Sequence, residues 1–368
     1  ERTAAIEGQG IDLKAATAEA KLGAGNVILA KVPALTQKHR NIFDSSKLQF
    51  LSMSDLGDEV ANTPELKATF EELAQATEFS SPHDSTALAV INTANHNAER
   101  LAVRVLCSMA KHAAVAGDHP KANSYLDAAG RINRYLTTQT QDVSVVAWFG
   151  NSRVMASTIL EILDELTLSA EQKKLYQATV KNNTTTHTLA SVAAGEIARL
   201  SQAARGLDQF DELQLMQLNT SGLNDGPLPT HPKAADAMIS QVIAFWGEAM
   251  KAAKEQGTSA FHSGIIIDTM TREWQKDLQP GNYMLRTMPV TYEQIGRTIT
   301  RGDQLWQIMN ALMAIVCGES APAGVTVDRQ GNDVTVSVAD VKKEFKRDAR
   351  DGLDVDQQVG VRVTVTLD

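Results

Sequence analysis

Residues 101–136 read LAVRVLCSMAKHAAVAGDHPKANSYLDAAGRINRYL, and this stretch decides the fold class of the chain. Apolar residues recur every three or four positions on both sides of Ala116-Gly117-Asp118, a spacing that places them on one helix face. They are Leu106, Met109, Ala110 and Ala113 before the turn, and Ala122, Leu126 and Ala129 after it. Gly117 suits the left-handed conformation that ends many helices, and Asp118 can cap the next helix, with Pro120 in its first turn. The stretch therefore predicts a helical hairpin, closely packed through small residues, with a positive φ at Gly117.

The composition indicates a globular, largely helical protein. The 368 residues are 43% hydrophobic and 21% charged, which is enough for a sizeable core and suggests about two domains. Aromatic residues make up only 5%, while Ala and Leu recur throughout, and this favours close helix packing over a β-sandwich. The net charge of −9 argues against a nucleic-acid partner, which needs clustered Lys and Arg, and against a basic membrane-surface patch.

Further helices are expected wherever apolar spacing and capping residues agree. Thr63-Pro64-Glu65 starts one that runs to about Thr77, and Ser85 caps a long helix that ends at Ala116. Residues 169–172 are close to a capping box, and the helix that follows is expected to break near 182–184, where weak helix formers cluster. The other expected helices cover 12–22, 119–136, 143–166, 187–204, 234–255, 259–275 and 292–317.

The C-terminal segment changes from helical spacing to strict alternation, which is typical of β-strands. Residues 325–327 and 334–338 alternate around a turn-rich gap and predict a β-hairpin, and 359–367 predict a third strand. A short charged helix is expected between them, over 341–350. Each strand has one apolar side to bury, so the sheet must pack on the helical body or on a partner. Its outermost strand would leave backbone groups for a neighbouring chain.

Together these patterns predict a mainly α protein of stacked antiparallel helical hairpins, either an α-solenoid or an irregular bundle. A small antiparallel β element is expected at the C-terminus. Three parts are expected along the chain: an irregular lead-in over 1–60, a helical domain over 61–318, and the β-containing element over 325–368.

Several segments resemble known proteins. The hairpin resembles a single tetratricopeptide-type unit. The stretches GIDLKAA, GNVILAKVPAL, the hairpin with its preceding AER, and LDELTLSAEQKKLYQATV resemble uncharacterised, membrane-anchored helical proteins of planctomycete and verrucomicrobial genomes. The segment DVSVVAWFGNSRVM departs from that group, which tends to have Glu-Pro and an apolar run there. The resemblance implies an extracytoplasmic position behind an N-terminal signal anchor, and it brings no established activity.

The start of the chain is compatible with this location. Residue 1 is Glu rather than Met, so a leader or membrane anchor could have been removed, and no run of 18 apolar residues is present to span a bilayer. We therefore expect an extracytoplasmic protein of the periplasm or cell envelope, with a cytoplasmic location still open.

Two histidine pairs have spacings that metal sites use, but each has a simpler interpretation. His96 and Glu99 share a helix face, and without a second matching acid or His they are interpreted as a surface hydrogen-bonding pair. His112 and His119 flank the hairpin turn and could form a metal clip. We favour compensation of the helix dipole, because histidines near a helix end commonly act so.

The remaining candidates are also interpreted as structural. Glu196 and Arg199 are expected to form a surface ion pair, and Cys107 and Cys317 to be buried, inert thiols. Helically spaced aromatics that could line a ligand groove are assigned to the core: Trp148, Phe149, Phe245 and Trp246. An acidic cluster could bind calcium but lacks EF-hand spacing, so a solvated loop is favoured: Asp348, Asp351, Asp354 and Asp356.

No nucleophile elbow, phosphate-binding glycine loop, Rossmann pattern or zinc-protease helix is present in the sequence. We therefore expect no catalytic, cofactor-binding or metal-binding residues. The leading hypothesis is a non-catalytic extracytoplasmic scaffold or protein-binding module, since stacked hairpins form concave surfaces for extended partners. Two alternatives stay open: a subunit of a larger cell-envelope assembly that adds a strand to the β element, and a hydrolase whose site combines distant His and acidic residues.

Overall fold

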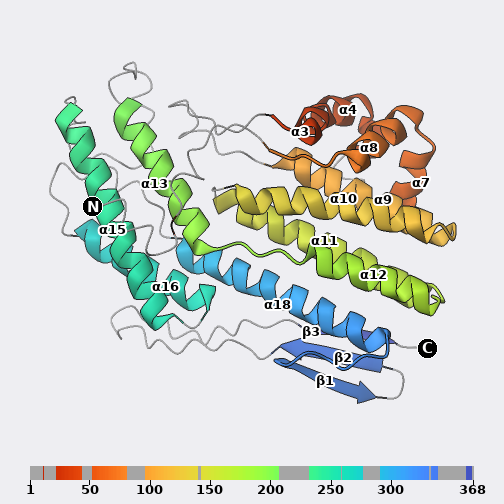
Figure 1. Cartoon of the computed structure of the whole chain (residues 1–368). Helices are drawn as coiled ribbons and strands as arrows, with labels where there is room; N and C mark the ends of the chain where they lie inside the picture. The colour runs from red at the N-terminus through yellow and green to blue at the C-terminus, as the bar shows by residue number, and fades with distance from the viewer. Residues whose placement is uncertain are drawn as a thin grey trace.

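The computed structural model describes residues 11, 22–43, 52–80, 96–139, 142–206, 232–257, 259–276, 291–330, 333–338 and 362–366. As expected, the protein is mainly helical with a small C-terminal antiparallel sheet (Figure 1). The helices are α3 (Ala24–Leu29), α4 (Val32–Lys38), α5 (Arg40–Phe43), α7 (Met53–Ala61), α8 (Pro64–Gln75), α9 (Asn97–Val115), α10 (His119–Thr138), α11 (Asp142–Glu165), α12 (Ala170–Asn183), α13 (Leu189–Gly206), α15 (Pro232–Gln256), α16 (Ala260–Lys276) and α18 (Tyr292–Val316). The strands are β1 (Val325–Gln330), β2 (Asp333–Val338) and β3 (Arg362–Thr366).

The α9–α10 hairpin confirms the prediction made from residues 101–136. Gly117 has φ +81°, and the amide of Asp118 donates to the carbonyl of Ala113 at 2.9 Å, which closes the end of α9. Asp118 then caps α10, because its carboxylate accepts a hydrogen bond from the amide of Lys121 at 3.1 Å.

The local signals after α11 are confirmed as well. Ser169 and Gln172 form a complete capping box at the start of α12, with hydrogen bonds of 2.8 and 3.2 Å. Helix α12 ends at Asn183 and α13 begins at Leu189, so the expected break lies where the weak helix formers cluster.

The central helices are arranged in two layers. Helices α7, α9, α11 and α18 are successive neighbours in one layer, which we call the front layer. Helices α8, α10 and α12 are successive neighbours in the other. Consecutive helices alternate between the layers, so the stack is built of antiparallel hairpins (Figure 1). The first hydrophobic core lies between the layers and includes Leu106, Leu126, Trp148, Ile159 and Trp306.

A second hydrophobic core joins α13, α15, α16 and the first half of α18. Its aromatic rings meet edge to face: the Trp246 centroid lies 5.5 Å from that of Phe245 and 5.1 Å from that of Tyr292. Helix α18 also contributes Leu305 and Met309 to the first core, so it is buried on several sides.

The sheet has the order β1-β2-β3 with antiparallel pairing throughout. Val334 and Val336 of the central strand are 2% and 0% exposed, and they pack on Ile308 and Leu312 of α18. The sheet therefore packs on the helical body. The expected helix over 341–350 lies outside the described residues.

The expectation of an irregular lead-in over 1–60 is wrong for its described part, which contains α3, α4, α5 and α7. Apolar residues of these helices, among them Ile28, Val32, Phe43 and Leu56, belong to the first core. Helices of four to nine residues are too short for a clear apolar period, so tertiary packing stabilises them instead. The expected helix over 12–22 lies outside the described part of the chain.

The expected start of the long helix at Ser85 is also wrong, because α9 begins at Asn97. His96, the residue before it, has φ +47° and ψ +27°, a left-handed conformation through which a right-handed helix cannot continue. Residues 85–95 themselves are outside the described ranges.

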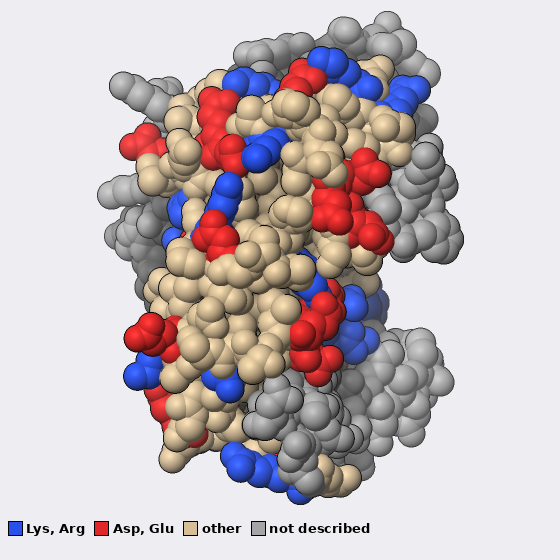
Figure 2. Space-filling model, turned by 90° about the vertical axis from the view of Figure 1, so that its right-hand side faces the viewer, with Lys and Arg blue, Asp and Glu red and all other residues tan. Residues whose placement is uncertain are grey.

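The surface at the end of the molecule with the α9–α10 turn carries both signs of charge. Figure 2 shows basic and acidic side chains interspersed there and separated by uncharged surface. Among the described residues in this view, the basic side chains do not form one continuous patch of the kind that nucleic-acid binding requires. Among the helices with described residues, none is both long and apolar enough to cross a bilayer.

Candidate functional site

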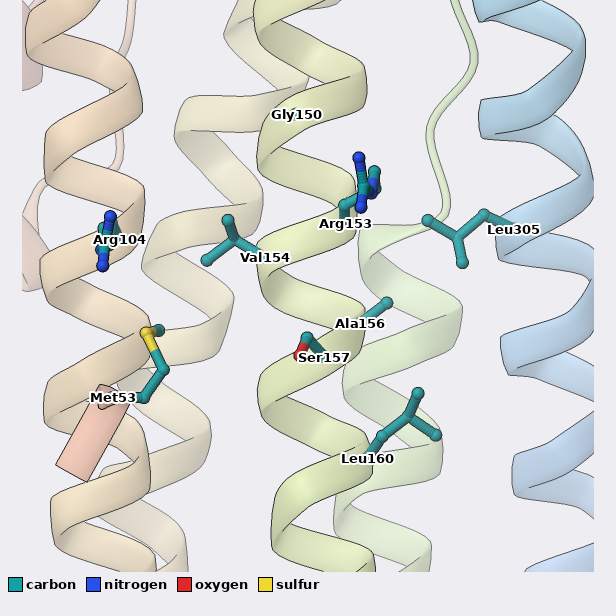
Figure 3. Close-up of a pocket in the computed structure, with 9 residues that line it drawn as sticks. All are labelled: Met53, Arg104, Gly150, Arg153, Val154, Ala156, Ser157, Leu160 and Leu305. Carbon is teal, nitrogen blue, oxygen red and sulfur yellow. The ribbon is translucent and has the colours of Figure 1, made fainter. Parts of the chain in front are cut away.

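A groove with a volume of about 510 Å³ lies over α11 on the front layer (Figure 3). It is lined by Met53 of α7, Arg104 of α9, Leu305 of α18, and Gly150, Arg153, Val154, Ala156, Ser157 and Leu160 of α11. Because the lining comes from four helices, the groove forms only when the whole front layer is assembled. Its volume lies in the range of known ligand pockets.

The helical period of α11 explains the floor of the groove. Gly150, Val154 and Ser157 recur three or four residues apart and so share one face, while Arg153, Ala156 and Leu160 share the adjacent face. In Figure 3, α11 lies between α9 and α18, with Arg104 and Met53 on one side and Leu305 on the other. Most of the lining is small or apolar.

The charged groups of the lining are arginines. Arg153 is exposed, Arg104 is half-buried, and no carboxylate is among the nine lining residues. The exposed Arg100 lies one turn before Arg104, and its guanidinium would be 3.7 Å from a Cβ placed on Gly150. Arginine stays protonated in proteins, so this part of the groove is positively charged on a chain of net charge −9.

The acidic side chains next to the groove are held by a buried lysine. Lys111 is 1% exposed, and its Nζ lies 3.1 Å from Glu161 and 2.7 Å from Glu165, both on α11. The hydroxyl of Ser157 also donates to Glu161, at 3.2 Å. These contacts direct the carboxylates to Lys111 and fix α9 beside α11.

Ser144 and Ser191 both contact His187, as the serine of a hydrolytic pair would, but the Ser191 hydroxyl donates to the carbonyl of Thr188 at 2.7 Å. The Ser144 Oγ lies 3.3 Å from His187 Nε2, and both residues are at most 1% exposed. However, His187 Nε2 is 3.0 Å from the carbonyl oxygen of Leu136, which can only accept, so Nε2 carries the ring proton. Burial also lowers the pKa of His187 to about 4. Nε2 thus cannot take the proton of Ser144, whose hydroxyl donates to the carbonyl of Gln139 at 3.1 Å.

The structure brings His96 and Glu99 together but places them inside the protein. Their Nδ1 and Oε1 atoms are 3.6 Å apart, and His96 is only 7% exposed, so the interpretation as a surface pair is wrong. His96 has a left-handed backbone conformation where the sequence analysis expected a helix.

His112 and His119 do not meet, so the metal clip is wrong. His112 Nδ1 lies 2.6 Å from Asp58 of α7, and His119 Nδ1 lies 3.0 Å from the hydroxyl of Tyr176 of α12. The turn sends the two rings to opposite neighbours in the stack. Each therefore joins a pair of helices. His112 lies in the last turn of α9, as dipole compensation requires, whereas His119 is the first residue of α10, so dipole compensation does not describe it. Among the described residues, no three His, Cys, Asp or Glu side chains are grouped to hold a metal.

The two cysteines differ from each other. Cys107 is fully buried, and burial raises the pKa of its thiol to about 12. Cys317 is only half-buried, which corrects the expectation, because it follows the last turn of α18 and is covered on fewer sides. Burial still raises its pKa. Both thiols are free.

Glu196 is 6% exposed, so it lies inside the protein and not on its surface. The side chain of Arg199 and the acidic cluster at 348–356 lie outside the described part of the structure. Of the aromatics assigned to the core, Trp148, Phe245 and Trp246 are at most 1% exposed, which confirms that assignment for them.

Sequence reasoning missed the groove and the Lys111 contacts. The groove needs side chains from residues 53 to 305, and no local pattern joins them. Lys111 carried a usable signal, since it follows Cys107 by one turn on an apolar face, where a lysine needs a partner.

Comparisons with protein-family models, with curated proteins and with solved structures each gave no match. The fold and the groove define a mainly α-helical protein with a layered hairpin stack and a small sheet on its last helix.

Proposed function

We propose that this protein is a non-catalytic scaffold or protein-binding module whose groove over α11 receives a segment of a partner protein. The observation that supports this most directly is the lining of the groove. It combines apolar side chains from four helices with two arginines, and it contains no His, Cys, Asp or Glu. Apart from Ser157, whose hydroxyl donates to Glu161, the lining provides contact area and charge without a group suited to proton transfer or nucleophilic attack.

The polar groups of the lining also favour binding. Arg104 and Arg153 are hydrogen-bond donors only, and the hydroxyl of Ser157 is directed to Glu161. Stacked hairpins provide a surface that spans several helices, which suits an elongated partner better than a small substrate. The repeat character and the similarity to a tetratricopeptide unit are part of this proposal.

The proposed location is extracytoplasmic, in the periplasm or cell envelope, with attachment through an N-terminal segment. This part rests on the sequence resemblance alone. Fractionation of the cells that make the protein, with protease protection of intact cells or spheroplasts, tests it directly.

Site-specific photocrosslinking tests the binding function. A benzoylphenylalanine in place of Ser157 should capture a discrete partner protein in cells, because this residue lies on the groove floor. The matched control replaces Lys174, which is exposed on α12 in the other layer, and should capture nothing specific. Equal labelling from both positions, or no product from Ser157, would contradict the proposed function.

A second candidate, a subunit of a larger envelope assembly, is favoured by the edge of the sheet. In the described part of the chain, β1 pairs with β2 alone, and Asp328, Arg329 and Gln330 are exposed. An edge strand offers backbone groups to an added strand. The same photocrosslinker in place of Asp328 should then label a neighbouring subunit, and absence of a product would exclude this contact.

A further inference from the structure

We infer that the groove over α11 binds a short, extended, acidic segment of a partner polypeptide, in which carboxylates alternate with apolar side chains. This inference rests on the proposed function and specifies the chemistry of the partner. It follows from three features of the groove: the sign of its charge, the direction in which it crosses the helices, and its apolar floor.

The charge of the groove is the first feature. Two arginines and no carboxylate line it, and Arg100 adds a third guanidinium beside Gly150. The nearby Glu161 contacts Lys111 and Ser157. Arginine forms short, paired hydrogen bonds with carboxylates, so an acidic ligand complements this site better than a neutral or basic one.

The shape is the second feature. The lining crosses α11 from Met53 and Arg104 on the α9 side to Leu305 on α18, over two neighbouring helix pairs of the front layer (Figure 3). At about 8–10 Å between packed helix axes, the groove spans roughly 16–20 Å. An extended chain rises about 3.3 Å per residue, so about five or six residues cross it.

The floor is the third feature. Val154, Ala156 and Leu160 of α11 are apolar, and Met53 and Leu305 flank them. In an extended chain, alternate side chains point in opposite directions. One set of a bound segment can therefore lie on this floor, while the other set meets the long, exposed side chain of Arg153.

Fluorescence anisotropy with synthetic peptides tests the inference. The probe is a fluorescein-labelled peptide of about six residues in which Leu and Glu alternate. Two matched peptides carry Gln or Lys in place of Glu. We expect the protein to bind the Glu peptide at least about tenfold more tightly than the Gln peptide, and to bind the Lys peptide least. The affinity for the Glu peptide should fall as the salt concentration rises.

The protein variants use one exposed arginine inside the groove and one outside it. Arg153→Glu should weaken binding of the Glu peptide by about tenfold or more. Arg329→Glu makes the same charge change on β1 and should leave binding unchanged. Arg153→Gln keeps the test valid if the glutamate variant folds poorly, and far-UV circular dichroism checks the fold of each.

The outcomes separate this inference from the proposed function. Equal affinity for the Glu and Gln peptides, or no binding by any peptide, overturns the acidic segment. If laurate binds instead of the peptides, and its binding depends on Arg153, the ligand is a small anionic amphiphile and the inference is wrong. If the photocrosslinker in place of Ser157 still captures a protein partner in these cases, the proposed function stands. If it captures none, the proposed function fails as well.

Discussion

The α9–α10 and α16–α18 helix pairs are both closely packed, but different parts of the chain hold each pair together. In α9–α10 the turn is local: Gly117 ends the first helix, and Asp118 caps the second. In α16–α18 the cap is remote. Asp268 of α16 accepts hydrogen bonds from the amides of Tyr292 and Glu293 at 2.8 and 2.9 Å.

The glycines of the two pairs differ in the same way. Gly117 has a positive φ and open space around it, so its role is conformational. Gly264 lies within α16, and a Cβ there would overlap the carbonyl oxygen of Tyr292. The comparison shows that a local hairpin is encoded by backbone conformation, whereas a pair joined through distant residues depends on steric fit and remote capping.

The largest effect is expected at the close contact between α16 and α18. Gly264→Val should lower the free energy of unfolding by about 3 kcal/mol or more, because the added carbons overlap backbone atoms that cannot move cheaply. Chemical denaturation followed by circular dichroism measures it. A loss below about 1 kcal/mol would mean that α16 and α18 can separate without cost, and the contrast with α9–α10 would fail.

Removal of the remote cap should have the next largest effect. Asp268→Ala leaves the buried amides of Tyr292 and Glu293 without their acceptor, so we expect a loss of about 2 kcal/mol. Asp118→Ala is the matched local cap, and its exposed position predicts about 1 kcal/mol. Urea unfolding of both variants ranks them, and the reverse order would show that the remote cap contributes little.

A smaller effect is expected at the hairpin turn. Gly117→Val should cost about 1 kcal/mol or a little more, since a β-branched residue is strained at φ +81° but meets no neighbour. Gly117→Asn serves as the control, because asparagine tolerates this conformation better. If the two variants are equally stable, conformational strain is not what the turn depends on.

The last prediction concerns the pH dependence at Asp303 on α18, between the two cores. Burial raises its pKa to about 6, although Thr186 donates a hydrogen bond to it. A raised pKa means that the folded state favours the protonated form. Its contribution to stability is therefore complete below the ordinary value of 3.8 and is lost as the pH rises through about 6.

Asp303→Asn should accordingly make the protein more stable at neutral pH and flatten its stability profile between these two values. Thermal unfolding across that pH range measures the change. Asp328→Asn, on the exposed strand β1, should leave the profile as it is. An unchanged profile in the Asp303 variant would show that its carboxyl group is better solvated than its burial indicates.

The same contrast explains how much of the structure the sequence predicts. Most long helices, the Gly117 turn, the capping box at Ser169 and the first β-hairpin depend on residues within a few positions of each other, and these predictions are confirmed. The short helices before α8 are missed because they have little periodicity of their own. The left-handed conformation at His96 is missed because no glycine marks it.

The candidate site was beyond local pattern reading. Its lining joins α7, α9, α11 and α18. Leu305 is 152 positions from Arg153 in the sequence, but it lines the same groove because α18 packs beside α11. Which surface of the protein is hollow depends on how the front layer is completed.

Helix α18 has a consequence for how the protein folds during synthesis. It completes the front layer, supplies Ile295 and Ile299 to the second core, and provides Ile308 and Leu312 as the base of the sheet. A nascent chain lacks all three contacts until this late helix has left the ribosome. The earlier helices therefore keep apolar surface exposed until α18 packs on them. Chaperone binding should persist through most of translation and end when α18 docks. In hydrogen exchange of the finished protein, the amides of α18 should be among the slowest, because opening them disrupts every core at once.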